Sequence, residues 1–99
     1  MSKDKTMTSR RRPTHPGAVL REDVLPAMGI TVTEFAARLH VSRQTLHGVL
    51  AEHKPITAQL ALRIGKLLGN GPTLWAGMQQ AYDLWEAERA IADELRAIA

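Results

Sequence analysis

The chain has 99 residues and contains no cysteine and no long hydrophobic run. The missing thiols exclude a disulfide framework and a thiolate zinc site, and they fit a reducing compartment. No stretch approaches the roughly 18 apolar residues that a membrane span needs, and the N-terminus lacks the apolar core of a signal peptide. The sequence therefore predicts a soluble, cytoplasmic protein with no membrane contact.

The motifs of common enzymes and metal proteins are also missing. There is no glycine-rich phosphate loop, and Ser42 and His47 are five residues apart, which places them on different faces of a helix. The four histidines do not show the spacing of metal ligands. We therefore expect no catalytic residue, no metal and no cofactor, and an enzyme is the least favoured class.

Charge is divided unevenly along the chain. Residues 1–66 carry eleven Lys and Arg against five Asp and Glu, a formal charge of +6, whereas residues 67–99 carry two against five, a charge of −3. A basic front part predicts an anionic partner such as nucleic acid. Residues 1–14 are basic and aperiodic and predict a disordered arm, with a solvated tail favoured over a groove-reading arm for its three arginines.

No run of alternating β-branched residues and no internal repeat competes with helical spacing, so residues 15–99 predict one all-α domain. A first helix opens at Pro16, and Pro26 should leave it short or kinked. The next two helices are marked by a capping box from Thr31 to Glu34 and by an N-cap at Ser42. Their inward faces comprise Phe35, Ala36 and Leu39, then Leu46, Val49 and Leu50. Two capped helices around so tight a turn predict a helix-turn-helix.

Two further helices follow the helix-turn-helix. The fourth runs from Thr57 to Gly69, and the fifth begins at Gly71-Pro72. The inward residues are expected to be Leu60, Ile64, Leu67 and Leu68 in the fourth, and Leu74, Trp75, Met78, Ala81, Tyr82 and Trp85 in the fifth. Ile91, Leu95 and Ile98 continue the second of these faces. We interpret its aromatic residues as core and dimer seam rather than as a ligand cage.

Four motifs in order resemble one known family. They are H-P-G-x-x-L-R-E-D from His15, T-x-T-E-x-A-x-R-L-x-V-S-R-Q-T-L from Thr31, I-T-x-x-x-A-L-R-I from Ile56 and L-W-x-x-x-Q-x-x-Y-D-L-W from Leu74. This series resembles the HigA-type antitoxins, within the Xre/phage-repressor-like helix-turn-helix class. The resemblance implies a compact five-helix, lambda-repressor-like domain with a C-terminal dimerisation helix. It also implies a homodimer that binds a palindromic double-stranded DNA operator, represses its own operon and neutralises a RelE-like endoribonuclease toxin.

The resemblance also implies which residues meet DNA. The second helix of the motif should enter the major groove with its N-terminal residues against base edges. Arg43 can read guanine or hold a phosphate, Gln44 can read adenine, and the methyl group of Thr45 can contact thymine. The complete predicted set is Thr31, Ser42, Arg43, Gln44, Thr45, His47 and Lys54, in which Thr31, Ser42 and Lys54 serve the phosphate backbone.

Three positions depart from the family pattern. His40 stands where the family usually has glycine, so the resemblance implies that His40 adopts a left-handed conformation. Gly48 replaces a longer polar or basic side chain, and residues 51–53 replace the family's common Asn-Gly. Dimerisation is predicted to use Trp85, Ile91 and Leu95. Three surfaces remain open for the toxin: the basic arm, the first helix with Arg21, Glu22 and Asp23, and the acidic fifth helix. A stand-alone regulator without a toxin is the alternative.

Overall fold

The protein is described from a computed structural model that places residues 11–98, so residues 1–10 of the expected arm lie outside the described part. Every regular element of residues 11–98 is helical, which confirms the all-α class. The elements are α2 (Pro16–Val19), η1 (Leu20–Val24), α3 (Leu25–Met28), α4 (Val32–Leu39), α5 (Arg43–Leu50), α6 (Ala58–Leu68), α7 (Pro72–Ala90) and α8 (Ala92–Ala97). None of these helices is both long and apolar enough to cross a bilayer.

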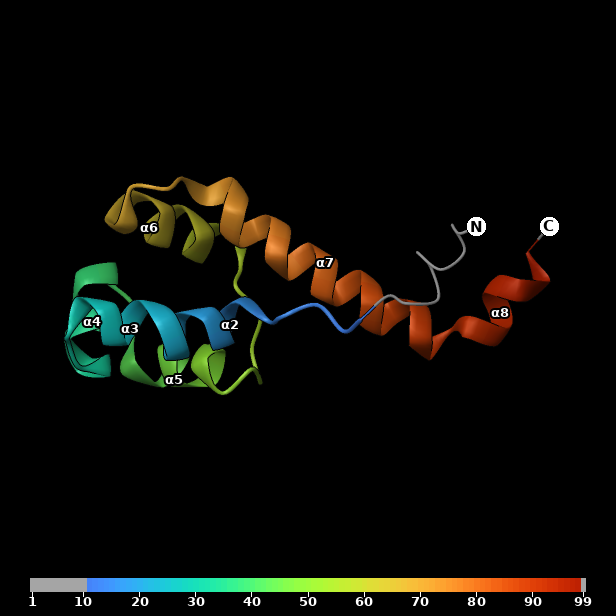
Figure 1. The fold of residues 1–99 in the computed structure, drawn as a ribbon, viewed down its shortest axis with the longest axis horizontal. Helices are drawn as coiled ribbons and strands as arrows, with labels where there is room; N and C mark the ends of the chain where they lie inside the picture. The colour runs from blue at the N-terminus through green and yellow to red at the C-terminus, as the bar shows by residue number, and fades with distance from the viewer. Residues whose placement is uncertain (1–10, 99) are drawn as a thin grey trace.

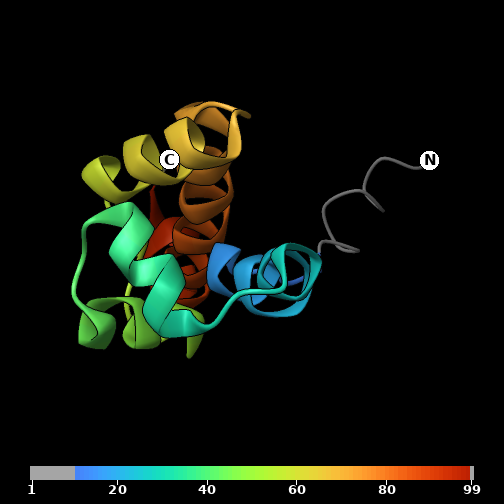
Figure 2. The same cartoon turned by 90° about the vertical axis from the view of Figure 1, so that its left-hand side faces the viewer.

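The helices form a body with one long extension. The helix made of α2, η1 and α3 lies beside α4 and α5 at one end of the molecule, and α7 leads away from this body to α8 at the other end (Figure 1). Viewed along the molecule, the N-terminal helix, the α4–α5 pair and α6 are arranged around α7 (Figure 2). The pair α6 and α7 makes the most extensive helix–helix contact.

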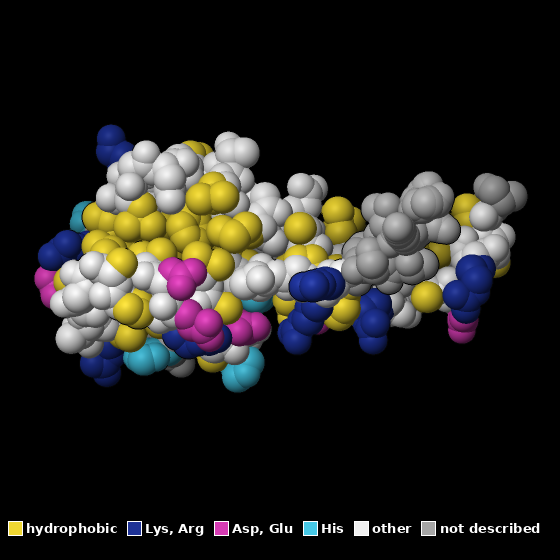
Figure 3. Space-filling model, in the orientation of Figure 1, with side chains coloured by type: hydrophobic (Ala, Val, Ile, Leu, Met, Phe, Trp, Pro, Cys, Tyr) yellow, Lys and Arg dark blue, Asp and Glu magenta, His cyan; other side chains and the backbone are white. Residues whose placement is uncertain are grey.

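The core lies where these helices meet. Its buried hydrophobic residues are Leu20, Leu25, Phe35, Ala36, Leu39, Leu46, Val49, Leu50, Ile56, Leu60, Ala61, Ile64 and Trp75. Every element from η1 to α7 therefore contributes, and the inward faces predicted for α4 and α5 are confirmed. Hydrophobic side chains still reach the surface in a band across the body, between α6 and the N-terminal helix (Figure 3).

The first helix continues past Pro26, so of the two outcomes expected for it, short or kinked, the short one is wrong. Backbone angles stay helical from Pro16 through η1 to Met28, and the Leu25 amide donates to the Leu20 carbonyl, five residues back. The resulting π-turn places Pro26 at the start of α3, where a missing amide is tolerated. The helix then ends at Gly29, which has φ 66°.

The inward face of α7 is rotated slightly from the predicted one. Trp75 and Tyr82 are buried as expected, but Leu74 and Ala81 are exposed and the polar Gln79 is buried instead. The Gln79 side chain fits the interior because Oε1 accepts from the Ile56 amide at 2.8 Å and Nε2 donates to Asp83 at 2.9 Å. A buried amide group with both ends paired replaces the apolar residue that periodicity favoured.

Candidate nucleic-acid interface

The turn between α4 and α5 contains the left-handed residue expected from the sequence. His40 has φ 60° and ψ 42°. Its amide donates to the Ala37 carbonyl at 3.2 Å, and the Val41 amide donates to the Ala36 carbonyl at 3.1 Å. This pair of bonds is a Schellman motif, which ends α4 and reverses the chain. The three residues of the turn therefore set how α5 is aimed relative to α4.

Side-chain caps fix the beginning of both helices. Thr31 Oγ1 accepts from the Glu34 amide and Ser42 Oγ accepts from the Thr45 amide, each at 3.0 Å, as predicted. The second half of the expected capping box is wrong, because the Glu34 carboxylate accepts from Arg38 at 2.7 Å rather than reaching back to Thr31. A charge-assisted pair one turn along the helix competes well with a neutral backbone donor.

The outer face of α5 presents three of the predicted DNA-contacting side chains. Arg43, Gln44 and His47 are exposed, whereas Thr45 is half-buried and its hydroxyl accepts from Ser42 Oγ at 2.9 Å. Arg43 Nη1 donates to Thr33 Oγ1 at 3.3 Å, so this guanidinium group lies near the beginning of α4. The contact links the starts of both helices, and no sequence pattern predicted the part played by Thr33.

The first helix holds the C-terminal half of α5 in place. A side-chain carbon at Gly17 would lie 1.9 Å from the Val49 carbonyl oxygen, so only glycine allows this close approach. Arg21 Nη1 donates to the Leu50 carbonyl at 2.6 Å and to the Glu52 carboxylate at 3.2 Å. Gly17 and Arg21 both belong to the H-P-G-x-x-L-R-E-D motif, but no sequence pattern links them to the end of this helix.

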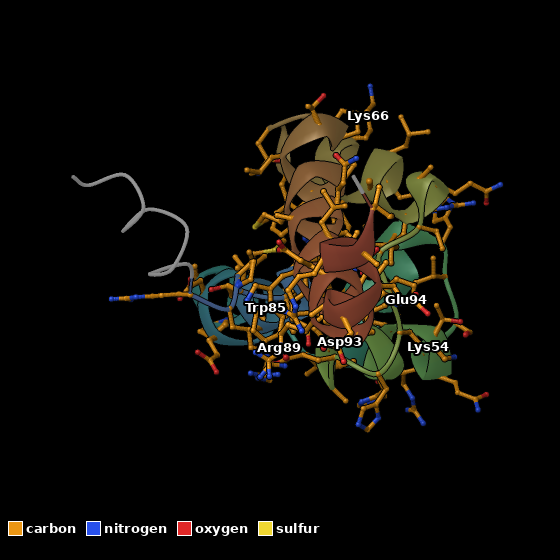
Figure 4. The ribbon with its side chains drawn as sticks, turned by 90° about the vertical axis from the view of Figure 1, so that its right-hand side faces the viewer. Lys54, Lys66, Trp85, Arg89, Asp93 and Glu94 are labelled. Atoms are coloured by element: carbon orange, nitrogen blue, oxygen red, sulfur yellow. The ribbon has the colours of Figure 1, made fainter. Side chains whose placement is uncertain are left out.

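The predicted phosphate-contacting Lys54 lies in the loop after α5 and is exposed (Figure 4). Its ammonium group has no hydrogen-bond or ion-pair partner within residues 11–98. It lines a hollow of about 500 Å³ together with Ser42, Thr45, Thr57 and Arg63. The hollow therefore joins the beginnings of α5 and α6, and two cations border it.

The three residues predicted for dimerisation lie at the far end of the molecule. Trp85 is half-buried, and the guanidinium carbons of Arg12 and Arg89 lie 5.8 and 4.7 Å from the centre of its ring (Figure 4). Ile91 and Leu95 are 42% and 40% exposed. Trp85 is thus largely engaged within its own chain, and the other two remain available to a partner.

A shallow apolar groove between α6 and α7 was missed from the sequence. Its volume is about 850 Å³, and it is lined by Leu62, Leu84, Ala76 and Gly77 among others. Leu62 and Leu84 are 58% and 62% exposed. Both leucines lie outside the faces that helical periodicity assigned to the core. In the sequence, a second row of apolar residues on α7 could have indicated this groove.

Within the described residues, no group of three or more His, Asp or Glu side chains could share a metal ion. His15 is the strongly buried histidine, and its Nδ1 accepts from the Gly17 amide at 2.9 Å, which caps α2. Its ring meets Tyr82 edge-on at 4.9 Å. Burial lowers the pKa of His15, with a smaller lowering from Arg12 and an opposing effect from Glu52 and other carboxylates.

No family model matches the chain, but it is similar to several known proteins. "Antitoxin HigA-1" of Vibrio cholerae is 31% identical over 90 residues, which cover 91% of this chain and 85% of that protein. "Uncharacterized HTH-type transcriptional regulator YbaQ" of Escherichia coli K12 is 32% identical over 78 residues, 79% of this chain and 69% of that protein. The structure of Pseudomonas aeruginosa antitoxin HigA with the higBA promoter has a TM-score of 0.84 at 30% identity, covering 89% of this chain and 96% of that chain.

Proposed function

Because the chain belongs to the HigA family of helix-turn-helix antitoxins, we propose that it binds operator DNA, represses its own operon and neutralises a RelE-like endoribonuclease. The family comprises antitoxins and DNA-binding regulators rather than enzymes. The observation that carries the proposal is the outer face of α5, where the side chains of Arg43 and Gln44 are exposed. A capped helix start that exposes such side chains suits insertion into the major groove.

Each group on this face has a distinct role in the proposed complex. Arg43 and Gln44 read base edges, since a guanidinium group matches guanine and an amide group matches adenine. His47 contacts the groove one turn further along, and Thr45 supplies its methyl group. Thr31, Ser42 and Lys54 hold phosphates on either side, through the amides at two helix starts and a single ammonium charge.

We propose that the chain acts as a homodimer. A single recognition helix covers few base pairs, and two-fold pairing doubles the contact on a palindrome. The groove between α6 and α7 extends the predicted seam of Trp85, Ile91 and Leu95 to Leu84, whose exposed side chain would otherwise remain in water.

The dimer is tested by sedimentation at micromolar concentration without DNA. Leu84→Glu should give monomers, whereas Gln59→Glu adds the same charge outside the groove and should leave a dimer. A monomeric mass for the unmodified chain would contradict the pairing.

DNA binding is tested by titrating the intact chain onto duplexes from upstream of its own coding sequence. Specific binding should be at least about a thousandfold tighter than binding to scrambled duplexes at physiological salt. Equal affinity for both kinds of duplex would contradict operator recognition.

The toxin partnership is tested by co-expression with the product of the neighbouring open reading frame. An antitoxin should co-purify with that product and block its ribonuclease activity. The likeness to a helix-turn-helix regulator favours a second candidate, a regulator without a toxin. Tight operator binding with no captured or inhibited neighbour would favour that alternative.

A further inference from the structure

Gly48 occupies the middle of α5, where glycine is a costly choice. In a helix interior glycine is less favourable than alanine, because it loses more backbone entropy on folding. Its backbone is helical and does not need the left-handed freedom of glycine. The local conformation therefore does not explain why this helix carries a residue without a side chain at position 48.

The space beside Gly48 is filled by a side chain from outside the helix. A Cβ atom at position 48 would lie 2.6 Å from Cδ of Lys54, 2.9 Å from its Cγ and 3.0 Å from its Cε. Contacts below 3 Å cannot be kept. The methylene chain of Lys54 therefore lies directly against the helix backbone, in the place that a side chain at position 48 would take.

The loop backbone holds Lys54 at this place. The Gly48 carbonyl accepts from the amides of His53 at 2.9 Å and Lys54 at 3.1 Å. Glu52 has φ 66°, which turns the chain back towards the helix, and its carboxylate is held by Arg21 at 3.2 Å. These hydrogen bonds hold the Lys54 backbone in place. A new side chain at position 48 would therefore displace the Lys54 side chain rather than the loop.

The ammonium group of Lys54 has no partner within residues 11–98. Lys54 lines the same hollow as Ser42 and Thr45, at the beginning of α5. A freely rotating lysine side chain loses conformational entropy when it is immobilised. A methylene chain already lying along the helix would lose less on contact with a phosphate.

We propose that Gly48 is a positioning residue for Lys54. The missing side chain lets Lys54 lie along the recognition helix and present its charge to a phosphate beside the base-reading residues. The inference rests on the proposed DNA binding and adds to it a residue that does not itself touch DNA.

The experiment is a double-mutant cycle on the full chain with Gly48→Ala, Lys54→Ala and both together. Affinity for the upstream duplex and for scrambled DNA is measured over a range of salt concentrations. Gly48→Ala should weaken binding to both about three- to tenfold and make the salt dependence shallower by up to about one phosphate contact. It should change nothing further in the Lys54→Ala background, because the group that it displaces is gone.

Thermal melts of the same four proteins separate positioning from damage to the fold. Gly48→Ala should melt at or above the temperature of the unmodified chain, because alanine favours the helix. Unchanged affinity and salt dependence in Gly48→Ala would overturn this inference but not the proposed function. An equal loss of affinity from Gly48→Ala in the unmodified and in the Lys54→Ala chain would do the same. Failure of the unmodified chain to bind any duplex would overturn the proposed function and this inference together.

Discussion

Replacing His40 by glycine should raise the free energy of unfolding by about 0.5–1 kcal/mol. His40 has φ 60° and ψ 42°, and its exposed imidazole has no partner within residues 11–98 that would be lost. The left-handed conformation costs a residue with a Cβ atom about 1–2 kcal/mol. Glycine relieves this strain, but its greater freedom in the unfolded chain lowers the free energy of unfolding by about 0.4–1 kcal/mol.

The chain offers a matched control with the opposite sign. Gly29 ends α3 with φ 66° and ψ 30°, close to the angles of His40, and no atom lies within 4 Å of the Cβ that alanine would add. Gly29→Ala should therefore lower the free energy of unfolding by about 0.5–1 kcal/mol through backbone strain alone.

Urea denaturation of both variants beside the unmodified chain gives the two differences, and operator binding is measured on the same samples. His40→Gly should bind DNA as the unmodified chain does, because the turn geometry is retained. His40→Pro should lose the motif and DNA binding, since proline cannot adopt a positive φ. A lower midpoint for His40→Gly would show that residue 40 is not left-handed in solution and would refute the geometry of the turn.

Three further predictions concern reading, packing and acid stability. Gln44→Ala should cost about 1–3 kcal/mol on the true operator and flatten discrimination at one base pair in a binding titration; an equal loss on all sequences would remove it from base reading. Gln79→Ala should lower the free energy of unfolding by about 1–3 kcal/mol, measured in urea, because the Ile56 amide is left buried and unpaired; no change would mean that water replaces the amide. His15 binds its proton more weakly in the folded chain, so stability should be full above its ordinary pKa of about 6.5 and fall as the pH drops through that value. The denaturation midpoint should be lower at pH 5 than at pH 7.5, and this difference should be smaller in His15→Asn, which keeps a capping group. An equal difference in both proteins would show that His15 does not cause the loss of stability.

Local features of the interface could be predicted because they depend on residues close together in the sequence. The caps at Thr31, Ser42 and Thr57 each accept from an amide three residues later. The left-handed conformation of His40 was implied by the family resemblance, and it too belongs to a short interval between two capped helices. In each case a short stretch contains both partners of the interaction, so no knowledge of the packed structure was needed.

Features that depend on packing could not be predicted in this way. The approach of Gly17 to Val49 and the placement of Lys54 against Gly48 become visible only once the helices and loops are assembled. Helical periodicity did not predict the apolar groove. Leu84 belongs to a second row of apolar residues on α7, whose first apolar face already packs into the core. Which of two apolar stripes is covered depends on where neighbouring helices end, and a single helical segment does not contain that information.

The surroundings of the two indole rings make them separate optical probes. Trp75 is buried in the body, with its Nε1 donating to Asn70 at 3.0 Å, so its emission should redden when the body unfolds. Trp85 is flanked by Arg89 from its own helix and Arg12 from the segment that precedes α2. The fluorescence of Trp85 should therefore respond when that segment lifts from α7, even while Trp75 remains buried. Opening of the N-terminal segment and unfolding of the body can thus be followed separately, without an attached dye.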